Sequence, residues 1–189
     1  DATVAIEHVT LIDGTDRGAQ PDMTVAVQDD RVVAVGPSTT IRLGQVKSRL
    51  DGKGMYLIPG LWDMHVHLAG YREHALPLFL ANGVTTIREV GGDLKTSGWI
   101  RQEVRAGRMM GPDVMIAGPV LDAPLVVKAV PVGRAAVPTP AEGVRMVDSL
   151  AALGVDLIKV HSLTPRAAYF AILREARAKG LFVAGHVPD

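Results

Sequence analysis

The amino-acid sequence predicts an α/β fold, with a small β domain ahead of a longer region of parallel strands and helices. Apolar residues make up 48% of the 189 residues, whereas aromatic residues make up only 4%. The core is therefore mostly Val, Leu, Ile and Ala, a composition that suits buried parallel strands. The pattern changes at residues 58–60, where Ile-Pro-Gly occurs. Beyond that point, helix-length segments ending in glycine alternate with short apolar runs, which is typical of βα units.

The first region, residues 1–58, is expected to form a β domain. Residues 3–12 and 23–35 are rich in β-branched side chains, and Asp29-Asp30 supplies a polar turn within the second run. We expect short antiparallel strands here. The predicted boundary divides the chain into residues 1–58 and residues 59–189.

The second region repeats a helix, a glycine and a short apolar strand. Glycine at the end of a helix supplies a left-handed cap, and Thr139-Pro140-Ala141-Glu142 reads as a capping box that starts a helix, with Thr164-Pro165 as a similar opening. Residues 118–138 read as a long loop that helps to set specificity. We expect strands near residues 61–67, 84–88, 113–117, 155–160 and 181–186, and helices near residues 72–82, 96–106, 140–153 and 165–179.

Five parallel strands cannot close an eight-stranded βα barrel, which typically needs about 250 residues. The second region is either an open doubly wound sheet or the first part of a barrel. The apolar runs lack the charges and prolines that protect natural sheet edges. We therefore expect the C-terminal remainder of a barrel, either as a continuation of the chain or as a second polypeptide.

Charge and composition narrow the classes of partner. The chain has 20 basic and 20 acidic residues, so a nucleic-acid partner and an anionic membrane are not expected. It has no cysteine, which removes thiolate metal sites and cysteine nucleophiles. No apolar run approaches the roughly 20 residues of a membrane span. Because residue 1 is Asp, the location is left open between the cytoplasm and export after removal of a leader.

Two histidines stand at the end of the first strand of the second region. Residues 61–67 read LWDMHVH, and the period of two in a strand sends His65 and His67 to the same face. Imidazole nitrogen is a ligand that zinc accepts readily. A His-x-His pair without further context is accidental about half the time. Whether this pair binds a metal therefore depends on the residues at the ends of the other strands.

Two further strands end in groups that could bind a metal. Lys159 and His161 share one face of the strand near residues 155–160, and His186 ends the next strand. Active sites of parallel α/β folds gather at such carboxyl ends. A buried lysine is costly unless it is paired or modified, and as a carbamate it could bridge two cations. Arg88 and Glu89 also end a strand, but such a pair is more often a local ion pair.

The chain resembles the amidohydrolase superfamily, in particular its imidazolonepropionase-like and Xaa-Pro dipeptidase-like members. The resemblance rests on four stretches in the family's order: IPGLWDMHVHL at residues 58–68, NGVTTIR at 82–88, GVDLIKV at 154–160 and AGHVP at 184–188. It implies the N-terminal part of a distorted (β/α)8 TIM barrel, preceded by a small β-sandwich domain.

The resemblance also implies roles for particular residues. His65 and His67 match ligands of one metal, Lys159 matches the carbamylated bridge, and His186 matches a ligand of the second metal. The family's aspartate general base would lie beyond residue 189. The resemblance fixes no role for His161, which we expect to contact substrate because it shares the strand face of Lys159. The expected cofactor is Zn²⁺, with two ions bound, and other divalent metals are the alternative. We also expect a homo-oligomer.

The sequence therefore predicts a metal-dependent hydrolase that cleaves an amide, peptide or lactam bond of a small molecule, as dipeptidases do. Lys159 favours this binuclear branch over mononuclear deaminases and imidazolonepropionases, which lack a bridging lysine. The residues leave a second class open, a non-catalytic α/β binding module with incidental histidines.

Overall fold

The computed structural model describes residues 1–68 and 72–188. The chain divides into two compact units, Asp1–Pro59 and Gly60–Asp189. None of the described helices is long and apolar enough to cross a membrane.

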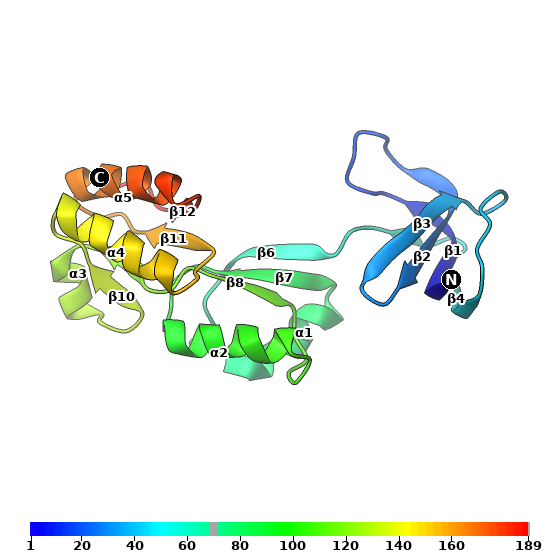
Figure 1. Cartoon of the computed structure of the whole chain (residues 1–189), viewed down its shortest axis with the longest axis horizontal. Helices are drawn as coiled ribbons and strands as arrows, with labels where there is room; N and C mark the ends of the chain where they lie inside the picture. Colours follow the sequence, from blue (N-terminus) through cyan, green and yellow to red (C-terminus); the bar gives the residue numbers. More distant parts are fainter. Residues whose placement is uncertain (69–71, 189) are drawn as a thin grey trace. The chain divides into compact units, whose positions relative to one another are not determined.

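The first unit is a single five-stranded sheet (Figure 1). Its strands are β1 (Ala2–Leu11), β2 (Gln20–Gln28), β3 (Arg31–Pro37), β4 (Val46–Asp51) and β5 (Tyr56–Leu57). β1, β2 and β3 pair antiparallel, and Asp29, with φ of +54°, lies in the predicted turn. β4 and β5 pair parallel with β1, so the prediction of an entirely antiparallel domain is wrong. The connection after β3 returns the chain to the start of β1, and β4 and β5 then pair with successive stretches of β1, residues 2–7 and 10–11.

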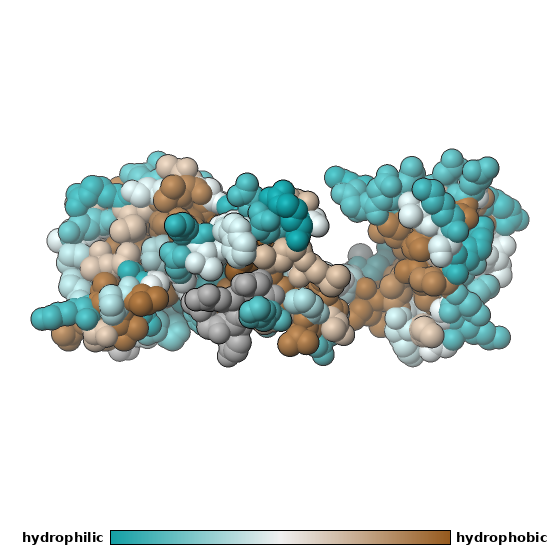
Figure 2. Space-filling view, turned by 90° about the horizontal axis from the view of Figure 1, so that it is seen from below, coloured by the Kyte–Doolittle hydropathy of each residue, from teal (hydrophilic) through white to brown (hydrophobic). Residues whose placement is uncertain are grey.

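One face of this sheet carries an apolar hollow. It has a volume of about 910 Å³ and is lined by side chains that include Ile6, Met23 and Val35. Figure 2 shows apolar side chains gathered on this unit and bordered by hydrophilic ones.

The second unit consists of parallel strands with helices beside them, as predicted. Its strands are β6 (Leu61–Val66), β7 (Val84–Glu89), β8 (Asp113–Ile116), β9 (Val120–Asp122), β10 (Arg134–Ala136), β11 (Leu157–Val160) and β12 (Phe182–Gly185). Its helices are the 3-10 turn η2 (Arg72–Ala75), α1 (Leu76–Ala81), α2 (Leu94–Arg105), α3 (Pro124–Ala129), α4 (Pro140–Ala152) and α5 (Arg166–Ala178).

The strands form two parallel sheets, β6-β7-β8 and β10-β9-β11-β12. The expectation of one five-stranded sheet is therefore wrong. The third strand is interrupted after Ile116, and Gly118, with φ of +72°, lies in the break. The sheets stay joined by backbone, because the amide of Asp156, just before β11, donates to the Ile116 carbonyl at 2.9 Å.

Residues 118–138 are not the loop that was predicted. They contain β9, α3 and β10, and β10 pairs parallel with β9. β9 and β10 have three residues each, too few for a period of two to be recognised.

Helix ends follow the sequence signals in most places. Thr139 forms the predicted capping box, because its hydroxyl accepts from the Glu142 amide at 3.3 Å and donates to the Glu142 carboxylate at 2.7 Å. Thr164 does not cap α5. Its hydroxyl is buried and lies 3.0 Å from the Leu121 carbonyl and 2.7 Å from the His161 carbonyl, so it fixes the turn after β11 instead.

Apolar side chains hold the strand ends in place from both faces. Ile87, Ile100 and Val114 belong to the core between β6–β8 and helices α1 and α2, and Ile158 and Ile172 belong to the core beside α4 and α5. Figure 1 shows α2 beside β7 and β8, and α4 and α5 beside β11. On the opposite face, a smaller cluster of Val90, Ala117 and Leu157 is buried. Lys159 follows Leu157 by two positions and therefore lies on that same face.

Gly185, the last residue of β12, is expected to tolerate no side chain. Its φ is +153°, and a Cβ atom would lie 2.1 Å from the carbonyl oxygen of Val160. We expect Gly185→Ala to lower the free energy of unfolding of the full-length protein by about 1–3 kcal/mol, measured by urea denaturation.

Gly98 provides the opposite control. It lies inside α2, and nothing is within 4 Å of the position of its Cβ. Gly98→Ala should raise the free energy of unfolding by about 0.5–1 kcal/mol, because alanine loses less backbone entropy in a helix. Equal stability of Gly185→Ala and the wild type would contradict the strand geometry that positions His186.

Candidate metal centre

His65 and His67 direct their rings to the same place. Their Nε2 atoms are 3.3 Å apart, and their ring centroids are 5.2 Å apart at an interplanar angle of 70°. The backbone amide of His65 donates to the Asp63 carboxylate at 3.1 Å, and this hydrogen bond fixes the backbone from Asp63 to His65. Two imidazole nitrogens thus converge at the end of β6, as the strand period predicts.

The turn after β7 sets the tautomer of His67. Its Nδ1 lies 2.9 Å from the Gly91 carbonyl oxygen. A carbonyl only accepts, so Nδ1 carries the proton and the Nε2 lone pair remains available as a ligand. Burial and the charge of Lys159 lower the pKa of His65, which favours the neutral ring that a metal requires.

Glu89 lies behind this turn and was not predicted to matter. It is fully buried, its Oε2 accepts weakly from the Gly91 amide at 3.4 Å, and its Oε1 has no partner among the described residues. Burial raises its pKa. The expected ion pair with Arg88 is absent, because neighbouring strand residues face opposite sides. Arg88 Nε instead donates to the Met64 carbonyl at 2.7 Å.

Lys159 is a buried lysine without a carboxylate partner. Its exposed fraction is 4%, and none of the ion pairs formed by the described residues includes it. Burial lowers its pKa, and the charges of Arg88 and Arg134 lower it further. The environment therefore favours the neutral amine.

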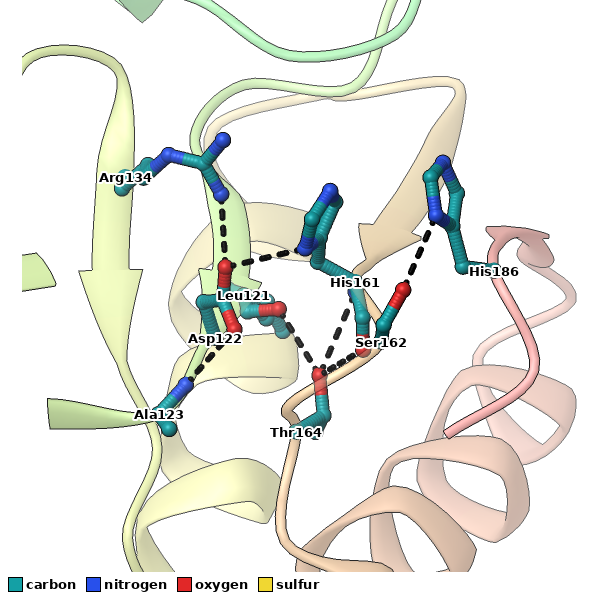
Figure 3. A network of polar contacts seen from close by, with 8 residues as sticks. All are labelled: Leu121, Asp122, Ala123, Arg134, His161, Ser162, Thr164 and His186. Atoms are coloured by element: carbon teal, nitrogen blue, oxygen red, sulfur yellow. Dashed lines mark hydrogen bonds and ion pairs between the residues drawn. The ribbon is translucent and has the colours of Figure 1, made fainter. Parts of the chain in front are cut away.

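His186 takes part in a different group. Its Nδ1 lies 3.0 Å from the Ser162 hydroxyl, and its ring centroid lies 4.4 Å from that of His161 (Figure 3). Across residues 1–68 and 72–188, no three histidine, aspartate or glutamate side chains gather closely enough to hold a metal ion. The expectation that His65, His67 and His186 come within coordination reach of one another is therefore wrong. Ser162 and His161 hold His186 as part of their own group.

Asp122 and Arg134 are the polar residues that the sequence interpretation missed. Asp122 ends β9 and is fully buried, and its Oδ2 accepts from Arg134 Nη1 at 2.6 Å and lies 3.3 Å from His161 Nδ1. Burial lowers the pKa of His161, although the charge of Asp122 opposes this. The one signal in the sequence is an aspartate after the apolar pair Val120-Leu121, which is too short to identify a strand.

Comparison with known proteins gives relatives by sequence, although no family model matches the chain. An imidazolonepropionase of Stenotrophomonas maltophilia is 32% identical over 109 residues, which is 56% of this chain and 25% of that protein. An adenine deaminase of Rubrobacter xylanophilus is 30% identical over 96 residues, which is 47% of this chain and 16% of that protein. The chain thus spans about a quarter or less of the length of these curated relatives.

Solved structures match nearly the whole chain. A candidate prolidase from Bifidobacterium longum has a TM-score of 0.85 at 28% identity and covers 98% of this chain, which corresponds to 49% of that protein. Bottromycin amidohydrolase has a TM-score of 0.80 at 26% identity, with 98% of this chain and 39% of that protein covered. Molinate hydrolase, at 20% identity and a TM-score of 0.83, is similar in fold alone. The predicted resemblance is therefore confirmed, since the chain is similar in sequence and in fold to proteins of the amidohydrolase superfamily.

Proposed function

We propose that the chain belongs to a metal-dependent hydrolase that cleaves a C–N bond in an amide, peptide or lactam of a small molecule, in the manner of a dipeptidase. The observation that carries the proposal is the pair of Nε2 atoms on His65 and His67, which lie 3.3 Å apart. Lys159 lies close enough for its charge to lower the pKa of His65. The names of the relatives, an imidazolonepropionase and an adenine deaminase, support a hydrolase of this superfamily.

The residues present fit a divalent cation. The Nε2 atoms of His65 and His67 point to one place, and His67 Nδ1 lies 2.9 Å from the Gly91 carbonyl oxygen, which fixes the ring. These two would hold one ion, a carbamylated Lys159 would reach both ions, and His186 would hold the other. His186 contacts Ser162 and His161 rather than His65 or His67, so we assign it to the second of the two proposed ions. A bound divalent cation would supply Lewis acidity and lower the pKa of water to near neutrality.

Lys159 has the surroundings that carbamylation requires. Its neutral amine would attack the carbon of carbon dioxide, so that a new N–C bond forms and the amine proton passes to water. The product is an anion on a long side chain. Two nearby arginine charges, those of Arg88 and Arg134, favour it over an unmodified ammonium group.

We also propose that the second unit is part of a (β/α)8 barrel and that the first is part of a β-sandwich. The outer strands β6 and β12 each pair on one side only among the described residues, and Leu61, Trp62 and Phe182 are exposed on them. The apolar hollow on the first sheet supports a β-sandwich, because a second sheet would cover it. The covering strands would come from a continuation of the chain or from a second polypeptide.

A mononuclear deaminase or imidazolonepropionase activity is the second candidate, and the names of the sequence relatives favour it. Metal content separates the two candidates. Elemental analysis of the full-length protein, purified without chelator, should give two divalent ions per chain for the dipeptidase-like reaction and one for the alternative. Hydrolysis of dipeptides and N-acyl amino acids should stop on chelation and return when Zn²⁺ is added back. A metal-free protein that remains active would exclude both candidates.

A further inference from the structure

A buried carboxylate organises three strand ends near the candidate metal centre (Figure 3). Asp122 is fully buried, its Oδ1 accepts from the Ala123 amide at 2.9 Å, and its Oδ2 accepts from Arg134 Nη1 at 2.6 Å. A buried charge is costly unless it is paired and hydrogen-bonded. The Asp122 carboxylate is restrained by burial and by the Ala123 amide, and it in turn positions the Arg134 guanidinium.

Only one nitrogen of the Arg134 guanidinium, Nη1, takes part in this contact. Within the described part of the chain, Nε and Nη2 form no hydrogen bond, and the side chain is 22% exposed. Figure 3 shows the second terminal nitrogen of Arg134 pointing to the same side as the second ring nitrogens of His161 and His186. The Nε–Nη2 edge presents two parallel N–H donors, the arrangement that a carboxylate accepts in bidentate fashion.

The charges around this edge favour an anion. Arg88 and Arg134 both lie close enough to Lys159 to lower the pKa of its amine. Asp122 is paired with Arg134, whereas Arg88 donates to a backbone carbonyl and has no carboxylate partner among the described residues. The strand ends therefore carry an excess of positive charge, even before any cation binds.

The distances connect this edge to the candidate metal ligands. His161 Nδ1 lies 3.3 Å from Asp122 Oδ2, and the His161 ring lies 4.4 Å, centroid to centroid, from the ring of His186. His161 thus lies between Arg134 and His186. An anionic group held by Arg134 would be one imidazole ring away from the proposed reaction centre, which suits the two ends of one small molecule.

We propose that Arg134, positioned by Asp122, binds a carboxylate group of the substrate, so that the preferred substrates are amides that carry a carboxylate. The proposal rests on the proposed function for the position of the scissile bond. The binding of a carboxylate by Arg134 can be measured without catalysis. Arg134 is a specificity-determining residue in this scheme, and Asp122 is a positioning residue.

The test compares matched ligands on the metal-free full-length protein by calorimetry. The ligands are the N-acetyl derivatives of alanine, proline, leucine and phenylalanine, each as the free acid and as the primary amide. At least one acid should bind more tightly than its amide. Arg134→Lys keeps a positive charge beside Asp122 but loses the two parallel N–H donors of the guanidinium. It should therefore weaken binding of that acid roughly 10- to 100-fold and leave binding of the amide unchanged.

Arg101→Lys is the matched control. Arg101 is 18% exposed and donates through Nη1 to Asp156 at 3.0 Å, but Asp156 lies before β11, at the opposite end of the strand from His161. This variant should bind acids and amides as the wild type does. Equal binding of every acid and its amide would overturn the proposal, as would equal losses in the two lysine variants.

Kinetics of the metal-loaded protein separate this proposal from the proposed function. Arg134→Lys should raise KM for the acid with little change in kcat, because the carboxylate contact is the same in the ground state and the transition state. If acids bind preferentially but none is hydrolysed, the proposed function fails and the carboxylate site stands. If an acid and its amide are hydrolysed equally well, the carboxylate site fails and the hydrolase stands.

Discussion

Lys159→Ala is expected to lower hydrolytic activity more than about 100-fold, because loss of a residue that only supports a ligand already costs 10- to 100-fold. The variant should also retain fewer divalent ions per chain. Lys159 is 4% exposed and has no carboxylate partner among the described residues, so its removal breaks no ion pair. The change in metal content, measured by elemental analysis, reports the role directly.

Short carboxylic acids distinguish loss of a bridging anion from loss of structure. Formate or acetate at high concentration should restore part of the activity of Lys159→Ala, since either could occupy the space of the carbamate. Lys179→Ala is the control, because Lys179 is 41% exposed and pairs with Asp148 on the surface at 2.7 Å. Normal metal content and normal activity in Lys159→Ala would show that Lys159 is a structural residue.

The paired replacement His65→Asn and His67→Asn is expected to have the largest effect. Their Nε2 atoms are 3.3 Å apart, and asparagine supplies no imidazole nitrogen at either place. The double variant should lose at least one divalent ion per chain, and activity should fall by more than about 100-fold, since ligands contribute more than the groups behind them. Elemental analysis and initial rates at saturating Zn²⁺ measure both effects.

His8→Asn is a suitable control for that experiment. His8 lies in the first unit with φ of +60°, a conformation that asparagine adopts more readily than most residues. It should keep full metal content and activity. Unchanged metal content in the double His65 and His67 variant would contradict the proposed centre, whatever happens to the rate.

The sequence predicted the parts of the fold that depend on local chemistry. Gly154 and Gly180 end helices with φ of +72° and +71°, and Thr139 starts α4 as a capping box. The backbone requires these residue types at these places, so the sequence carries the information directly. The period of two likewise placed the rings of His65 and His67 together.

Features that depend on contacts between distant segments could not be predicted in this way. Asp122 becomes important because Arg134 and His161, which are 12 and 39 positions further along, pack against it. The parallel pairing of β4 with β1 also depends on tertiary packing. A single sequence gives no period or spacing that reports such contacts. Strands of three residues are also too short for their alternation of apolar and polar residues to be recognised.

The break in the third strand separates the candidate metal donors from the segment that carries Asp122 and Arg134. β8 continues the sheet of β6 and β7, whereas β9 and β10 carry Asp122 and Arg134. The candidate metal donors lie on or directly after β6, β11 and β12. Substitutions in and around α3, where Leu125 and Val132 are exposed, therefore alter the surroundings of Arg134 without moving those donors. Under the proposed function, evolution could therefore change the substrate that is bound at one segment and keep the reaction at another.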